Sequence, residues 1–159
     1  MAGKYRALDL RSAKGTGDQG LPSQLDTLLV HWLDKRGTNR VPPRAALPVQ
    51  DLRPWLGHCA LIDVTVHGDF RFRICGPNLI VRFGREATGM LASSLAADIA
   101  QPLGTILEAA CAARAPVAAM SYVALGRELE THADLALPLS DGTDRVGALL
   151  LGSYPAKAG

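Results

Sequence analysis

The chain has 159 residues, of which 48% are hydrophobic and 20% are charged, and this length and composition are typical of one globular domain. Its formal net charge of +2 is small and Lys and Arg form no block, so no nucleic-acid partner is expected. The sequence contains neither the uninterrupted apolar run of a membrane span nor that of a secretion signal, which predicts a cytoplasmic protein with no membrane insertion.

The N-terminal part predicts a tail and one amphipathic helix. Residues 1–21 are rich in Gly, Lys, Arg and Asp without periodicity, which indicates a flexible tail. Ser23 offers an N-cap, and we expect a helix over residues 23–36 that ends at Gly37. Its apolar stripe consists of Leu25, Leu28, Leu29, Trp32 and Leu33. Two interpretations of this stripe are compatible with each other: it caps the domain's own sheet, or it packs against a second copy of the chain.

The next two apolar runs predict a β-hairpin. CALIDVTV (59–66) and FRFRIC (70–75) flank the turn-prone triplet His67-Gly68-Asp69. With this triplet as the loop, one face is wholly apolar through three pairs: Val66 with Phe70, Val64 with Phe72, and Ile62 with Ile74. The other face places Asp63 opposite Arg73. This pair is either a structural ion pair or part of an interface with the N-terminal helix or a partner chain.

The remaining patterns complete an α+β fold. They predict helices over 77–83 and 99–114 and strands over 116–124, 129–139 and 146–154. In the second of these strands Glu130, His132 and Asp134 alternate with apolar residues, so we assign them to a wetter face. The last strand is apolar on both alternations and therefore belongs at the centre of the sheet. We expect a single domain over 22–155: a five-stranded antiparallel sheet with helices on one face, preceded by the amphipathic helix.

This element order, with its central last strand, is similar to the PAS fold. Three motifs, FRFRICG, FGREATG and ALPLSDG, resemble those of a proteobacterial family of stand-alone PAS-like proteins, in which the strand reads Arg-Phe-Arg and the loop Phe-Gly-Arg-x-x-Thr-Gly. The resemblance covers roughly residues 25–154. It implies a sensory or regulatory module of bacterial signalling rather than an enzyme, in a family whose members commonly form homodimers, and it names no ligand. A signalling protein partner is expected because the chain contains no output domain.

PAS domains can hold cofactors, and the residues here argue against two of them. A haem-ligating histidine of a PAS domain comes from the long helix, but residues 99–114 contain no histidine, and we interpret His132 as a surface residue. Light-sensing flavin domains need a cysteine after Gly-Arg-Asn, whereas this chain has Gly84-Arg85-Glu86-Ala87. No cysteines or histidines show zinc-ligand spacing. We therefore predict no cofactor and no metal, and leave open a small ligand of unknown identity.

A ligand pocket is expected between the apolar sheet face and the helices of residues 77–114. Its candidate lining residues, each of which core packing explains equally well, are Val64, Phe72, Ile74, Ile80, Phe83, Met120, Tyr122 and Leu149. The alternative function is a small cavity-containing α+β enzyme of the isomerase or dehydratase kind. It needs an inward-facing Asp or His, which the strand alternation does not provide, although a buried Asp63 facing the helices would favour it.

Two further sets of residues have open interpretations. Arg82 and Arg85 either bind an anion near the glycine-containing loop or are solvated or ion-paired surface residues. Cys59 and Cys75 are expected close together on one face of the hairpin, as small buried hydrophobic residues or as a redox switch.

Overall fold

The computed structural model describes residues 5–7 and 20–156, without the side chains of 5–7 and 123–125. It contains one six-stranded antiparallel sheet in the order β1-β4-β5-β6-β2-β3. The strands are β1 (Tyr5–Ala7), β2 (Cys59–Val64), β3 (Phe70–Cys75), β4 (Val117–Leu125), β5 (Glu128–Ser140) and β6 (Val146–Pro155). The helices are α1 (Ser23–Arg36), α2 (Pro77–Phe83) and α3 (Ala97–Ala113), with short 3-10 turns η1 (Arg44–Ala46), η2 (Val49–Leu52), η3 (Leu56–His58) and η4 (Ala92–Ser94).

The five predicted strands and three predicted helices are confirmed, and β6 lies between β5 and β2 as expected. The sixth strand is β1, which pairs with Val117–Ala119 of β4. Its three residues fall within the predicted tail, so this part of the stretch lies on the sheet edge instead. Apart from Gly20 and Leu21, the rest of the predicted tail lies outside the described residues.

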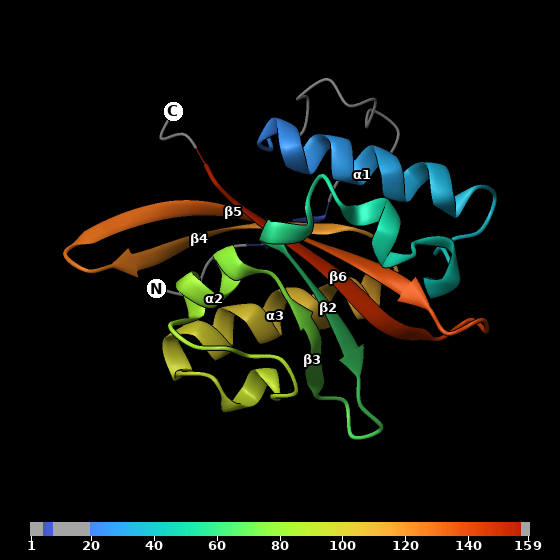
Figure 1. Cartoon of the computed structure of the whole chain (residues 1–159). Coiled ribbons are helices and arrows are strands. Elements are labelled where there is room, and N and C mark those ends of the chain that lie inside the picture. Colours follow the sequence, from blue (N-terminus) through green and yellow to red (C-terminus); the bar gives the residue numbers. More distant parts are fainter. Residues whose placement is uncertain (1–4, 8–19, 157–159) are drawn as a thin grey trace.

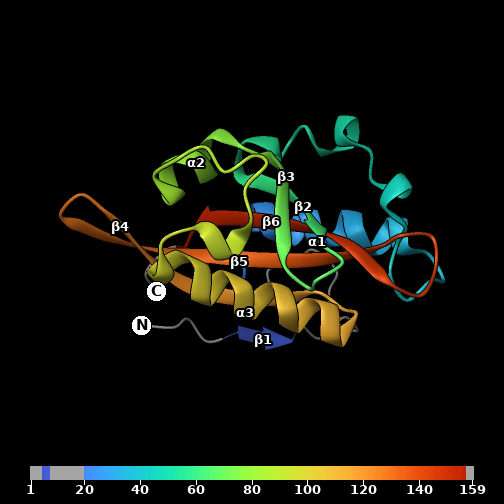
Figure 2. The same cartoon turned by 90° about the horizontal axis from the view of Figure 1, so that it is seen from below.

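Helices cover both faces of the sheet (Figures 1 and 2). On one face α1 buries Leu25, Leu28, Leu29 and Trp32, each at most 1% exposed, against β5 and β6. The indole N–H of Trp32 donates to the carbonyl oxygen of Pro138 at 2.9 Å. The apolar stripe of α1 therefore caps the chain's own sheet. On the other face α2 and α3 cover a second core that includes Phe72, Phe83 and Leu149.

The β2–β3 hairpin forms, but its register differs by two residues from the predicted one. Val64 pairs with Phe70 and Ile62 with Phe72. The loop is longer because Thr65 and Asp69 close it: the Thr65 backbone N–H donates to the Asp69 carbonyl at 2.8 Å, and the Asp69 N–H donates to Thr65 Oγ1 at 3.0 Å. Because strand side chains alternate with a period of two, this shift by itself moves no side chain to the other face.

A β-bulge at Arg73 changes the lower half of this hairpin, because Ile62 pairs with Phe72 while Leu61 pairs with Ile74. Arg73 still reaches Asp63, with Nε–Oδ2 at 2.7 Å, and Arg44 of η1 binds the other carboxylate oxygen at 3.0 Å. The predicted ion pair is therefore present as a diagonal contact on the α1 side of the sheet.

The bulge also separates the two hairpin cysteines. Cys59 packs in the core beneath α1, whereas Cys75 packs against the core on the α2–α3 side, so the expectation that they share one face is wrong. Burial raises the pKa of the Cys59 thiol to about 12 and that of Cys75 to about 11. Thiols with such pKa values stay protonated near neutral pH, which favours the small buried hydrophobic role over a redox switch.

Candidate functional site

The structure does not bring the eight expected lining residues around one cavity. Phe72, Phe83 and Leu149 fill the α2–α3 core, and Val64 packs at its margin. The described surface carries a small pocket beneath α2 and two wider grooves of about 750 Å³ and about 520 Å³, and none of the eight residues, Ile80 included, lines any of these three.

Three of the eight residues lie away from the α2–α3 face altogether. The bulge turns Ile74 toward the core beneath α1. Met120 and Tyr122 are 40% and 54% exposed. The physical reason is that the β4–β5 hairpin projects beyond the helices that cover the rest of the sheet (Figure 1), so alternation alone does not bury its side chains.

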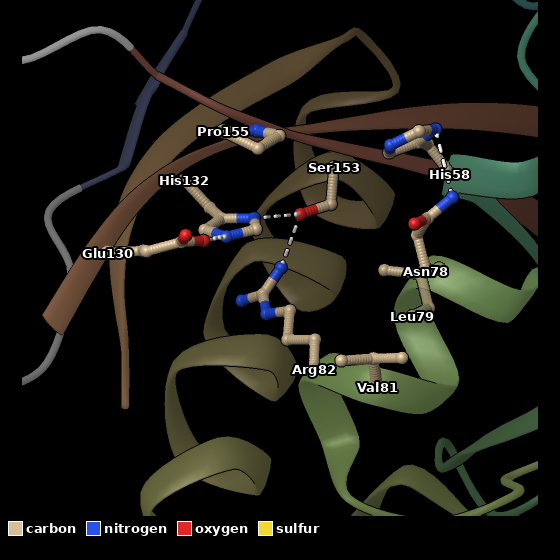
Figure 3. A pocket seen from close by; sticks show the side chains of 9 residues that line it. All are labelled: His58, Asn78, Leu79, Val81, Arg82, Glu130, His132, Ser153 and Pro155. Carbon is tan, nitrogen blue, oxygen red and sulfur yellow. Dashed lines mark hydrogen bonds and ion pairs between the residues drawn. The ribbon is translucent and has the colours of Figure 1, made fainter. Parts of the chain in front are cut away.

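The most enclosed of the three pockets, which we call the α2 pocket, has a volume of about 120 Å³. Side chains from η3, α2, β5 and β6 surround it (Figure 3). Its lining residues are His58, Asn78, Leu79, Val81, Arg82, Glu130, His132, Ser153 and Pro155. Polar side chains, among them two histidines, an arginine and a glutamate, thus stand among mainly apolar walls, and none of these residues belongs to the set that the sequence predicts.

Local sequence determines how α2 presents Arg82 to the sheet. The helix begins at Pro77, whose missing N–H costs nothing at the first position, and it ends at Gly84, which has φ +73°. Leu79, Arg82 and Phe83 have i, i+3, i+4 spacing and share one helix face. Because Leu79 and Phe83 are buried in the core, the guanidinium of Arg82 is directed toward the strands, and its side chain is only 9% exposed.

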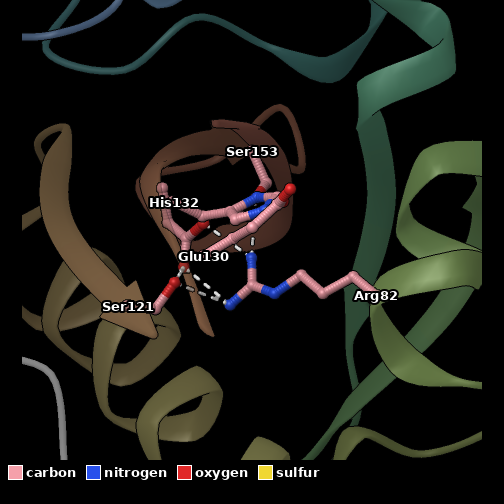
Figure 4. A network of polar contacts seen from close by, with 6 residues as sticks. Arg82, Ser121, Glu130, His132 and Ser153 are labelled. Atoms are coloured by element: carbon pink, nitrogen blue, oxygen red, sulfur yellow. Dashed lines mark hydrogen bonds and ion pairs between the residues drawn. The ribbon is translucent and has the colours of Figure 1, made fainter. Parts of the chain in front are cut away.

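Arg82 forms a buried hydrogen-bonded network with three strands (Figure 4). Its Nη1 donates to Asp134 Oδ1 at 2.6 Å and to Ser153 Oγ at 2.7 Å, while Nη2 donates to Asp134 Oδ2 and to Ser121 Oγ, both at 3.0 Å. Ser121 Oγ in turn donates to Asp134 Oδ2 at 3.0 Å. One side chain of α2 is thus joined to β4, β5 and β6.

The face of β5 that carries Glu130, His132 and Asp134 is not the wetter face that we expected. His132 is 9% exposed and Asp134 is 4% exposed, because α2 lies over them. His132 is therefore not a surface residue, and Arg82 is ion-paired but buried. Sequence reasoning missed this cluster; the available signal was an arginine on the buried face of a short helix together with an aspartate between apolar strand residues.

Hydrogen bonds continue from this network into the pocket. Ser153 Oγ lies 3.5 Å from His132 Nδ1, and His132 Nε2 lies 3.1 Å from Glu130 Oε2. Figure 3 shows His132 and His58 on either side of Ser153. Since Ser153 Oγ accepts a hydrogen bond from Arg82, its own hydrogen is available to His132 Nδ1, and His132 Nε2–H then donates to Glu130.

The other end of the pocket is formed by Asn78 and His58. Asn78 Nδ2 donates to the Gly57 carbonyl at 3.1 Å and lies 3.4 Å from His58 Nδ1. Burial first, and the nearby His132 second, lower the pKa of His58, so its ring is neutral near pH 7. Gly76 makes this arrangement possible, because an added Cβ would lie 2.6 Å from the Gly57 carbonyl oxygen and push α2 away from η3.

The chemistry of the cluster does not favour catalysis. Ser153, His132 and Glu130 have the residue types of a hydrolase triad, but Ser153 is 2% exposed and its oxygen is held by Arg82. Both carboxylate oxygens of Asp134 are engaged, and so are both oxygens of Asp63 on the opposite face. Asp134 and Asp63 are therefore held in ion pairs that occupy both of their carboxylate oxygens.

Within residues 5–7 and 20–156, no group of three His, Cys, Asp or Glu side chains is arranged to hold a metal ion. Among the helices in those ranges, none has the length and apolar character that crossing a bilayer requires.

Comparisons with known proteins give two similarities. A family model described as "PAS domain" matches residues 22–153. Among solved structures, the PAS domain of BvgS from Bordetella pertussis is similar with 13% sequence identity and a TM-score of 0.42, over 67% of this chain and 84% of that chain. No curated protein matches the chain at a significant level.

Proposed function

Since the chain belongs to the PAS domain family, a family of sensory and regulatory modules, we propose that it is a non-catalytic regulatory module that binds a small polar molecule in the α2 pocket. The observation that carries this proposal is the buried network of Arg82 at the pocket floor. Two histidines, an asparagine and a glutamate line the space above it. Ligand pockets combine such convergent polar groups with apolar walls.

The same network would transmit ligand binding to the rest of the domain. The pocket is lined by α2 on one side and by β5 and β6 on the other, and Arg82 joins them. A ligand that contacts both sides favours the arrangement of α2 and sheet in which it fits best. The β4–β5 hairpin carries Glu130 and His132 on this side, so a change at the pocket acts directly on the hairpin.

Native mass spectrometry of the purified protein, compared with its denatured mass, tests ligand binding. Val81 lines the pocket and is 65% exposed, so Val81→Trp blocks the pocket without entering the core. Val30→Trp, at a 39% exposed position on α1, is the matched control. We expect a retained small mass that is lost in Val81→Trp and kept in Val30→Trp. A protein with no retained mass and no thermal shift across a metabolite set would refute ligand sensing.

We also propose that the homodimer expected from the family forms through the β4–β5 hairpin. The apolar stripe of α1 is buried within the chain, so it offers no surface to a second copy. Met120, Tyr122 and Leu129 share the opposite hairpin face from the pocket and are 40%, 54% and 68% exposed. Three large apolar side chains in one strip are characteristic of an interaction surface. Because the other face of the same hairpin lines the pocket, ligand binding would then change the strength of dimerisation.

A further inference from the structure

The charged groups of the α2 pocket are unequally available to a ligand. Arg82 directs four hydrogen bonds of 2.6 to 3.0 Å at Asp134, Ser121 and Ser153. Its charge is balanced by Asp134, which is buried behind it. The guanidinium is therefore occupied by hydrogen bonds within the protein, and Arg82 is not available to bind an anionic ligand.

The groups that remain open are mainly acceptors. Glu130 uses one carboxylate oxygen for His132 and its side chain is 42% exposed, whereas Arg82, the arginine of the lining, is paired with Asp134. The Asn78 side-chain amide nitrogen donates to the Gly57 carbonyl and lies next to His58 Nδ1, and its Oδ1 is directed into the pocket (Figure 3). His58 is neutral near pH 7 because its pKa is lowered. The lining thus offers acceptor oxygens and the Glu130 carboxylate, which Arg82 does not neutralise because Arg82 is paired with Asp134.

Shape adds a second constraint. Glu130 and Asn78 lie at opposite ends of the pocket in Figure 3, with Ser153 between them. Leu79, Val81 and Pro155 supply apolar walls along this length. A volume of about 120 Å³ is small beside the roughly 300–1,000 Å³ of pockets for drug-sized ligands. This space suits a short unbranched alkyl chain with a donor at each end.

We infer that the α2 pocket selects a short aliphatic amine with a second hydrogen-bond donor at its far end, of which α,ω-diamines are the simplest class. The ammonium group binds the Glu130 carboxylate, the second donor binds Asn78 Oδ1, and the methylenes lie against Val81 and Leu79. This assignment rests on the proposed ligand-binding function and specifies its chemistry.

Isothermal titration calorimetry with three probes of equal chain length tests the assignment: 1,4-diaminobutane, 1,4-butanediol and butanedioate. We expect the diamine to bind most tightly and butanedioate to give no binding heat. Glu130→Gln should weaken diamine binding by about tenfold or more, as expected for loss of a charge-assisted hydrogen bond. Glu128→Gln, two residues away on the same strand and exposed, is the control and should leave binding unchanged.

The outcomes separate this inference from the proposed function. If butanediol or butanedioate binds as tightly as the diamine and Val81→Trp abolishes that binding, the pocket is a ligand site but its preference for amines is overturned. Equal weakening by Glu130→Gln and Glu128→Gln would also overturn it. If none of the three probes binds, the amine assignment is refuted, and the retained mass in native spectrometry then decides the proposed function by itself. Thermal melts establish that both glutamine variants are folded.

Discussion

Replacing Arg82 with methionine would remove the guanidinium that joins α2 to the sheet. The side chains of Arg82 and Asp134 are 9% and 5% exposed, so the aspartate would be left buried without a counter-charge. Loss of one partner from such a buried pair costs about 3–5 kcal/mol. We therefore expect the free energy of unfolding of Arg82→Met to fall by about 3–5 kcal/mol. The double variant Arg82→Met/Asp134→Leu should recover most of this loss, because neither charge then remains.

Urea unfolding followed by tryptophan fluorescence measures these differences. The control is Arg73→Met, which removes the same residue type from an ion pair whose arginine is 57% exposed. Asp63 keeps Arg44 in that variant, so its unfolding free energy should change by no more than about 1 kcal/mol. If Arg82→Met cost no more than Arg73→Met, or if the double variant were as unstable as the single one, the Arg82 network would not hold α2 on the sheet.

Three further experiments test separate parts of the structure. The pKa of His58 is lowered in the folded protein, so the stability that this shift contributes is complete above the ordinary pKa of 6.5 and is lost as the pH falls through the folded pKa. The unfolding free energy of His58→Asn should therefore fall less than that of the wild type between about pH 7.5 and about pH 5. Gly76→Ala should lower the melting temperature, because its added Cβ would collide with the backbone of η3. Gly104→Ala, whose added Cβ would have no atom within 4 Å, should stabilise α3 by about 0.5–1 kcal/mol. Equal effects of the two substitutions would contradict the close approach at Gly76. The proposed homodimer should appear in light scattering of the wild type and should be lost in Tyr122→Lys but kept in Val66→Lys, at an 85% exposed valine between β2 and β3. A dimer that survives Tyr122→Lys, or a monomeric wild type, would exclude the hairpin interface.

Local patterns were sufficient to predict three helices, five of the six strands and the central place of β6. Pro77 and the spacing up to Phe83 predicted α2 with its observed bounds, and apolar residues on both alternations predicted that β6 is central. The hairpin register could not be derived in the same way. It depends on hydrogen bonds of Thr65 and Asp69 that lengthen the turn, and turn propensity alone does not specify them.

The sequence predicts only part of the candidate site. Alternation placed Glu130, His132 and Asp134 together on one face of β5, but it does not show which helix covers that face. That information comes from the position of α2, whose Arg82 is 52 residues away from Asp134 along the chain. The expected apolar pocket is not where hydrophobicity places it, for a related reason. Hydrophobicity indicates that Phe72 and Leu149 are buried, but a closely packed core leaves no space for a ligand between such residues.

The most direct test of the account is chemical-shift mapping of the ¹⁵N-labelled protein with 1,4-diaminobutane, 1,4-butanediol and butanedioate in separate titrations. We expect that at least one probe, and the diamine most strongly, produces saturable shifts concentrated in residues 78–83 and 130–132. These shifts should disappear in Val81→Trp. Saturable shifts confined to other parts of the chain would contradict the assignment of the α2 pocket as the binding site, and no saturable shifts with the diamine at millimolar concentrations would refute its preference for amines.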